Sequence, residues 1–297
     1  MRIRLLTLAG ALPLLLFTAC TPDALLTEVP TTQDATFLVD HGEDGIVDAP
    51  DFGLEARALV HRDVDEHAMA LESVEQETVV RPDGTVEEVY VVDGCIEMTK
   101  EQLAAERLYR ETGDKQHRSY NLVNRRVINV LGRNSGGAAL TAKQRKTLRW
   151  AINNYNALGG MNIRFNLRFG GDSNADIVVY RNASDNRNGG RAGFPYGNGA
   201  PFKWVQIYAG ADFLNDNTME HLITHEIGHC LGLRHTDWRD RRTCNQRGEN
   251  ANPTGAVHIP GTPTGYDANS VMRACYRNNR EDGELGFYDR RALEYLY

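Results

Sequence analysis

The stretch from residue 225 to residue 235 reads His-Glu-Ile-Gly-His-Cys-Leu-Gly-Leu-Arg-His and has the residue types of a metal site. His225 and His229 are four residues apart, so on a helix both imidazoles project from one face and can bind the same Zn²⁺ ion. Gly232 can adopt a left-handed conformation that ends the helix and turns the chain back, which lets His235 arrive as a third ligand. Three protein ligands leave one position open for water, as in catalytic rather than structural zinc sites.

Glu226 follows the first histidine and is the acid–base group that such a site needs. A carboxylate at this position can reach water at the metal and accept its proton without being a metal ligand. The alternative interpretation is an ordinary helix with surface histidines. Three histidines, one glutamate and one glycine at fixed spacing should arise by chance in only about one of 10⁵ chains of this length. The spacing therefore favours a metal site.

The motif resembles HExxHxxGxxH, the zinc signature of the metzincin metallopeptidases, and its HEIGH core resembles the bacterial dual-action HEIGH metallopeptidase family. The resemblance covers about residues 120–297 and a short element in the N-terminal half. It implies one catalytic Zn²⁺ bound by His225, His229 and His235. It also implies that Glu226 is the general base of a zinc endopeptidase that acts on proteins or peptides.

Two further parts of the metzincin pattern lie downstream. The sequence Ser270-Val271-Met272 ends 37 residues beyond His235 and resembles the Met-turn, in which the Met272 thioether would lie beneath the metal. Some metzincins use a tyrosine two residues after this methionine to stabilise the oxyanion. Ala274 stands there in this chain, so Tyr276 is the nearest candidate for that role. Asp237 is a candidate for a hydrogen bond to a ligand histidine, or it caps the following turn.

Three of the five cysteines have a structural interpretation. Cys244 and Cys275 flank the long connection between the third histidine and the Met-turn. A disulfide between them would close a loop of about 30 residues and stabilise the fold by about 3–4 kcal/mol. Cys230 follows a zinc ligand inside the helix, and we expect it to be a small buried residue.

Cys95 suggests a way to keep the enzyme latent. The segment Val92-Asp93-Gly94-Cys95-Ile96 resembles the propeptide segment of astacin-type metzincins that directs an Asp to the zinc, with Cys at the Asp position. A thiolate is a good zinc ligand and could displace the catalytic water, as in the cysteine switch of matrix metallopeptidases. The alternatives are a disulfide with Cys230 or a free thiol.

The N-terminus has the pattern of an export signal. Arg2 and Arg4 precede an apolar run of about 13 residues, too short to span a bilayer. Phe17-Thr18-Ala19-Cys20 resembles a lipobox, which predicts either lipidation of Cys20 or ordinary cleavage near Ala19. We expect residues 1–20 to be a signal peptide and the protein to be exported to the cell envelope or the medium, with a lipid as its only contact with a membrane.

Charge divides the rest of the chain into two parts. Residues 21–118 contain 24 acidic and 8 basic residues, a net charge of −16, whereas residues 119–297 contain 16 acidic and 23 basic residues, a net of +7. The first part is predicted to be an acidic propeptide whose charge complements the domain that it covers, or a solvating linker. Residues 21–90 have a composition typical of weakly folded chain. Residues 119–297 are the predicted catalytic domain.

The elements around the motif predict an α/β (α+β) metzincin-like domain, with a twisted mixed sheet, a backing helix, the active-site helix, the Met-turn and a C-terminal helix. Asp216 and Asn217 are predicted to cap the active-site helix. Ser184–Gly199 is predicted to be a loop near the cleft, and Asp114–Ser119 an exposed processing region. Substrate could pair with either Gly190–Phe194 or Trp204–Ala209. The expected strands are 86–92, 126–131, 162–169, 175–180 and 203–208, and the expected helices are 99–112, 141–158 and 288–297.

Two other classes of function stay open from the sequence. One is a zinc-binding or adhesion protein that has lost activity, and the other is a zinc hydrolase with a non-peptide substrate. The arginines of the basic half are scattered without a nucleic-acid motif, so nucleic acid is not an expected partner. The Asp- and Asn-rich loops contain no complete set of Ca²⁺ ligands, so Ca²⁺ is only an unsupported option. We expect a monomer.

Overall fold

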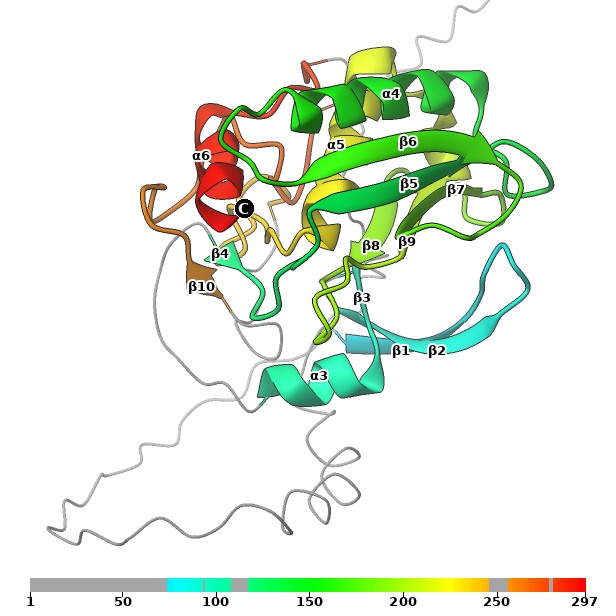
Figure 1. The fold of residues 1–297 in the computed structure, drawn as a ribbon, viewed down its shortest axis with the longest axis horizontal. Helices are drawn as coiled ribbons and strands as arrows, with labels where there is room; N and C mark the ends of the chain where they lie inside the picture. The colour runs from blue at the N-terminus through cyan, green and yellow to red at the C-terminus, as the bar shows by residue number, and fades with distance from the viewer. Residues whose placement is uncertain (1–73, 93, 108–116, 246–255, 278–279) are drawn as a thin grey trace, which may run out of the picture.

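The computed structural model describes residues 74–92, 94–107, 117–245, 256–277 and 280–297 (Figure 1). The predicted signal peptide with Cys20, and the acidic chain up to residue 73, lie outside the described residues. Within the described ranges, no helix is long and apolar enough to cross a membrane.

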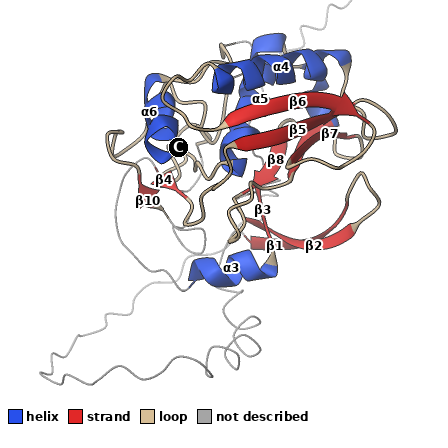
Figure 2. Cartoon of the chain, viewed as in Figure 1, coloured by secondary structure: helices blue, strands red, loops and turns tan. Residues whose placement is uncertain are grey.

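The main sheet is mixed and eight-stranded, with the strand order β1-β2-β3-β8-β9-β7-β5-β6 (Figure 1; strands are red in Figure 2). This arrangement confirms the predicted mixed α/β fold. The strands are β1 (Val74–Val80), β2 (Val86–Val92), β3 (Ile96–Met98), β5 (Val127–Arg133), β6 (Arg164–Gly170), β7 (Ile177–Asn182), β8 (Gly190–Gly193) and β9 (Trp204–Tyr208). The helices are α3 (Lys100–Arg107), α4 (Ala142–Asn156), α5 (Asp216–Cys230), α6 (Phe287–Leu296) and the 3-10 helix η2 (Ala209–Phe213). A separate small sheet pairs β4 (His117–Arg118) with β10 (Val257–His258).

The parallel half of the sheet is built by a strand–helix–strand crossover. β5 pairs in parallel with both β6 and β7, and β7 pairs in parallel with β9. The helix that connects β5 to β6 is α4, and it begins as predicted at the Thr141 cap, with Gln144 completing a capping box. Ile177, Val178 and Val179 of β7 are fully buried, as expected for a strand covered on both faces.

The active-site helix α5 packs between α4 and the sheet, which explains why all residues from Thr218 to Cys230 are buried. The Tyr155 hydroxyl of α4 donates to the Thr224 carbonyl of α5 at 2.7 Å and fixes the two helices to each other. The helix is capped by Asn215, whose side chain accepts from the Thr218 amide at 2.8 Å. The predicted capping by Asp216 and Asn217 is therefore wrong by one to two residues, a usual error for helix ends.

Residues 74–98, termed here the leader strands, are part of the main sheet. β1 and β2 form an antiparallel hairpin, β2 pairs with β3, and β3 pairs in parallel with β8. The predicted strand 86–92 is confirmed as β2, whereas the expectation of weak folding is wrong for residues 74–80, which form β1. Composition failed here because the partner strand, β8, comes from the basic half of the chain. The turn Pro82-Asp83-Gly84, with Gly84 at φ +86°, was the sequence signal for the hairpin.

Three smaller expectations also need correction. Ser184–Gly199 is not all loop, because it contains β8. Trp204–Ala209 is not a sheet edge, since β9 lies between β8 and β7. His117 and Ser119 are buried rather than exposed, because the segment pairs with β10 and the Ser119 amide donates to the Gly232 carbonyl at 2.8 Å. Residues 117–297, where described, are termed the body below.

Candidate metal centre

Three histidine side chains converge at the C-terminal end of α5. The Nε2 atoms of His225 and His229 are 3.0 Å apart, and the Nε2 atom of His235 is 3.3 Å from that of His225. The first two project from one face of α5, as the four-residue spacing predicts. Gly232 is left-handed at φ +91° and turns the chain back after the helix, as predicted, so that His235 can join them. All three histidines are buried.

Backbone carbonyls fix the tautomers of the two helical histidines. Nδ1 of His225 lies 2.8 Å from the Val271 carbonyl oxygen, and Nδ1 of His229 lies 2.8 Å from the Leu233 carbonyl oxygen. A carbonyl only accepts hydrogen bonds, so in the neutral rings each Nδ1 carries the proton and each Nε2 presents a bare lone pair. Two bare lone pairs 3.0 Å apart repel each other unless a cation lies between them. Two imidazole nitrogens oriented in this way, with His235 Nε2 close by, fit Zn²⁺.

Burial also favours the neutral, metal-binding form of the histidines. Desolvation lowers the pKa of His229 and His235 well below the ordinary value, and the neighbouring His225 lowers both further. A histidine must be deprotonated to bind a metal, so this environment removes competition by protons.

Glu226 lies against the backbone of β8 with both carboxylate oxygens free for another group. Among the described residues, neither Oε1 nor Oε2 has a hydrogen-bond partner, although the side chain is fully buried. Burial raises the pKa of Glu226 well above its ordinary value, and the positive charge of Arg191 opposes this. Gly190 of β8 packs against this carboxylate, because a Cβ added there would lie only 3.0 Å from Glu226 Oε1. A buried carboxylate without partners needs water or substrate beside it.

Residues 270–272, the predicted Met-turn, pack against α5 beside His225. A Cβ added at Gly228 would come within 2.5 Å of the Met272 sulfur, so only glycine allows this close approach of helix and thioether. The Met272 carbonyl accepts from the Thr236 amide at 2.7 Å, next to the third histidine. Val271 holds His225 as described above. The turn therefore supports two of the three histidines through its backbone.

Asp289 anchors the Met-turn and was not identified from the sequence. Its Oδ2 accepts from the amides of Val271 at 2.8 Å and Gly286 at 2.9 Å, and Oδ1 accepts from the Ser270 hydroxyl. The side chain is fully buried at the start of α6, and burial raises its pKa. Its position three residues after Gly286 is that of the acidic residue in a capping box, which was the available signal.

Asp237 and a disulfide hold the loop that follows the third histidine. Asp237 Oδ1 accepts from the Ala274 amide at 2.9 Å, and Oδ2 accepts from the Thr243 amide at 3.1 Å. The Thr243 contact is of the kind expected for capping of the following turn, whereas the Ala274 contact joins Asp237 to the chain after Met272. Cys244 and Cys275 form a disulfide with a Cα–Cα distance of 5.2 Å. The loop is thereby joined to the chain just after the Met-turn.

Tyr276 follows the disulfide cysteine Cys275 and contacts the loop before β8. Its hydroxyl donates to Asn188 Oδ1 at 3.1 Å, in the loop before β8. The side chain is buried, and burial followed by the charge of Glu226 raises the pKa of its hydroxyl above the ordinary value. The phenol therefore stays protonated and able to donate a hydrogen bond.

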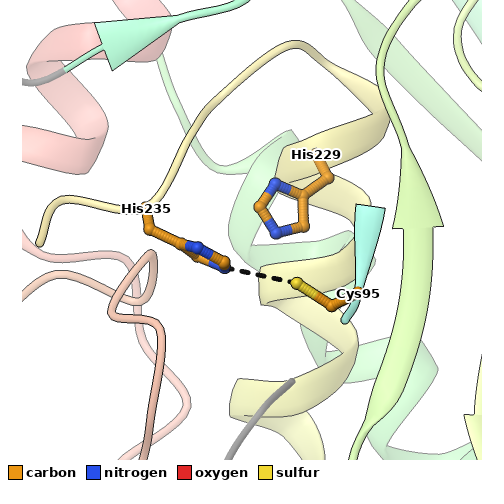
Figure 3. Close-up of side chains that lie close together, drawn as sticks. All are labelled: Cys95, His229 and His235. Carbon is orange, nitrogen blue, oxygen red and sulfur yellow. Dashed lines mark hydrogen bonds between the residues drawn. The ribbon is translucent and has the colours of Figure 1, made fainter. Parts of the chain in front are cut away.

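Cys95 reaches the metal centre from the start of β3. Its Sγ lies 3.8 Å from His235 Nε2, and the potential ligand atoms of Cys95, His229 and His235 all lie within 4.8 Å of one another (Figure 3). Cys230 is a free buried thiol, so the alternative of a Cys95–Cys230 disulfide is wrong. Cys95 is disulfide-bonded, so the free-thiol alternative is also wrong.

The family model described as dual-action HEIGH metallo-peptidase matches residues 89–297. The chain belongs to this family. The match begins within β2, so in this HEIGH metallopeptidase it includes β3 and Cys95 as well as the body. Similar solved structures include two of myroilysin, each 16% identical, with TM-scores of 0.36 and 0.38. They cover 58% and 65% of this chain and 79% and 95% of their own chains. No curated protein matches the chain significantly.

Proposed function

We propose that this HEIGH metallopeptidase is a zinc-dependent endopeptidase, exported and made as a latent precursor. The observation that carries the proposal is the convergence of three imidazole Nε2 atoms at a helix that also carries the buried Glu226 carboxylate. Membership of a metallopeptidase family supports peptide bonds as the substrate.

The chemistry is divided between the metal and the protein side chains. When bound to His225, His229 and His235, zinc acidifies water and polarises the scissile carbonyl. Glu226 accepts the proton of the attacking water and delivers it to the leaving amine. The raised pKa of Glu226 suits both steps, because the proton affinity of its carboxylate then lies closer to those of the attacking water and the leaving amine. The protonated Tyr276 hydroxyl is the candidate donor to the developing oxyanion, for which it must release its hydrogen bond to Asn188.

Substrate pairs with β8 in this proposal. In the precursor β3 occupies that edge, with Ile96 opposite Ala192 and Glu97 opposite Gly193. Once β3 has left, the exposed backbone groups of β8 can bind an extended peptide beside Glu226. Precursor and substrate therefore compete for the same hydrogen bonds.

Cys95 keeps the precursor latent in this proposal. Its support is the 3.8 Å distance from Sγ to His235 Nε2, which suits two ligands of one zinc ion. The zinc-bound form is the reduced thiolate, so it requires any disulfide of Cys95 to be open. We expect Cys95→Ala to raise the activity of the unprocessed, zinc-loaded precursor at least about ten-fold. Cys230→Ala, which removes the other buried thiol, is the control. A Cys95→Ala precursor that is no more active than wild type would contradict latency through Cys95.

The peptidase function is tested with the processed protein and casein, with and without a chelator. We expect chelator-sensitive cleavage, and a fall in kcat/KM of about 10²–10⁴-fold in Glu226→Gln with zinc content unchanged. Zinc binding without any cleavage would instead support the inactive-protein alternative. Turnover of small esters or amides but not peptides would support the non-peptide hydrolase.

Export is proposed from the first 20 residues. Arg2, Arg4 and the apolar run that follows support a signal peptide, and the residues up to Cys20 support a lipobox. Mass spectrometry of the mature N-terminus distinguishes a diacylated Cys20 from a free terminus after Ala19. A mature chain that still begins at Met1 would contradict export.

A further inference from the structure

A buried group of charged side chains lies where the leader strands meet the body. Arg191 of β8 is 2% exposed, and its guanidinium donates to Glu77 at 2.7 Å and 3.1 Å. The same guanidinium lies 3.6 Å from Glu97 Oε1. Both carboxylates, Glu77 and Glu97, belong to the leader strands, whereas Arg191 belongs to the body.

The leader strands supply the carboxylates that contact this guanidinium. Arg81 donates to the second oxygen of Glu97 at 2.8 Å and to Glu87 at 2.7 Å, so the leader contributes three carboxylates and one guanidinium to the group. The leader is therefore net negative here, and Arg191 of the body offsets part of that charge. When the leader leaves, Arg191 stays on β8 without the two carboxylates that contact it. A partly desolvated cation without a partner is costly and attracts an anion.

The body also supplies neutral donors at the same place. The Gln206 amide nitrogen donates to Glu97 Oε1, and the Gln206 carbonyl oxygen accepts from Asn182 at 3.0 Å. The second bond turns the NH₂ group of Gln206 towards the carboxylate. Tyr208 is 1% exposed, and its hydroxyl has no hydrogen-bond partner among the described residues. These donors are on β7 and β9, so they persist after the leader has left.

The position of this group relative to the metal follows from β3. Cys95 lies beside His235, and Glu97 is two residues further along, paired with Gly193 of β8. A peptide that replaces β3 on β8 also alternates its side chains between the two faces of the sheet. A side chain two or three residues from the scissile bond can then occupy the place of Glu97.

We infer that Arg191, Gln206 and Tyr208 form an acid-binding subsite that selects substrates with Glu or Asp two or three residues from the scissile bond. This inference rests on the proposed peptidase function. In the precursor, Glu97 and Glu77 occupy the subsite. They thus take the place of the acidic substrate side chain that the subsite binds in the processed enzyme.

The test uses the full chain, loaded with zinc and activated by limited proteolysis within the leader. Fluorogenic peptides carry either Glu or Gln at each of the three positions on both sides of the scissile bond. We expect a Glu over Gln preference in kcat/KM of at least about ten-fold, concentrated at one position two or three residues from the bond. Arg191→Gln should abolish this ratio, and Arg191→Glu should shift the preference towards Lys.

The control is Arg181→Gln on β7, whose arginine is already paired with Asp212 of the body at 2.6 Å. It should keep the wild-type Glu to Gln ratio. Cleavage of both peptides by the wild type at equal rates overturns the subsite even if the Arg191 variants do not fold. A ratio that survives in Arg191→Gln also overturns it. If neither the peptides nor casein are hydrolysed, the peptidase function itself is contradicted. This outcome differs from failure of the subsite alone, in which casein is still cleaved.

Discussion

The leader strands and the Met-turn both reach the metal centre, but they are fixed there by different interactions. The Met-turn is held within the body, by the close contact of Met272 with Gly228 and by hydrogen bonds to the buried Asp289. The leader strands bury some apolar side chains, yet their pairing with β8 is short and their polar contacts are charged. Arg191 lies on the body side of that boundary.

This difference indicates that the Met-turn is a permanent part of the metal centre, whereas the leader strands can be removed. The buried polar groups at the Met-turn have hydrogen-bond partners within the body, so breaking these contacts would cost free energy without compensation. Charged groups at the leader boundary regain hydration when they separate, which offsets much of the lost attraction. The body is therefore expected to keep its structure after the leader has been removed.

Asp289→Ala tests the permanent side and should have the largest effect. It leaves two buried amides and the Ser270 hydroxyl without their acceptor, and should lower the free energy of unfolding by about 3–5 kcal/mol. Denaturant unfolding of the zinc-loaded protein measures this. Asp172→Ala, at an exposed pair with Arg168, is the control and should cost less than about 1 kcal/mol. Equal losses in the two variants would refute the special role of Asp289.

Glu97→Gln tests the removable side. It leaves Arg81 and Arg191 without a shared carboxylate, and should weaken the docking of the leader strands by about 3 kcal/mol. Limited proteolysis should then cleave the leader about 100-fold faster. The melting temperature of the body should stay unchanged. Glu88→Gln, on the exposed side of β2, is the matched control. A variant in which leader and body lose stability together would contradict the separation of the two regions.

Glu220 gives a smaller, pH-dependent effect within the body. Burial raises its pKa to about 7, and the charges of Glu284 and Asp282 add to this, although a hydrogen bond from Asn154 opposes it. Because the folded state holds the proton more tightly, the stabilisation is full below about pH 4.5 and is lost as the pH rises through 7.

Relative to Glu220→Gln, the wild type should therefore lose about 1–2 kcal/mol of stability between pH 4.5 and pH 8. Urea unfolding at several pH values measures the difference. The same loss is expected in the full chain and in the processed protein, because Glu220 and its neighbours all belong to the body. Parallel pH curves for the wild type and Glu220→Gln would show that the Glu220 pKa is ordinary.

The elements that sequence could predict are those with local periodicity. The apolar alternation of β6 and the Thr141 cap of α4 depend on neighbours in the sequence, and so does the turn at Gly232. The missed features are non-local. β8 has too few apolar side chains to show a pattern in the sequence. Its burial comes from pairing with strands on both sides, which the sequence of β8 does not reveal. Asp289 and Arg191 are surface-type residues whose burial depends on partners more than 15 residues away.

The most direct test of the account is the zinc coordination of the full chain compared with the processed protein. X-ray absorption at the zinc edge distinguishes sulfur at about 2.3 Å from imidazole nitrogen at about 2.0–2.1 Å. For the full chain with Cys95 reduced, we predict three imidazole nitrogens and one sulfur, and for the processed protein three nitrogens and an oxygen. Four light-atom ligands in both forms would contradict the claim that the leader strands close the metal centre through Cys95.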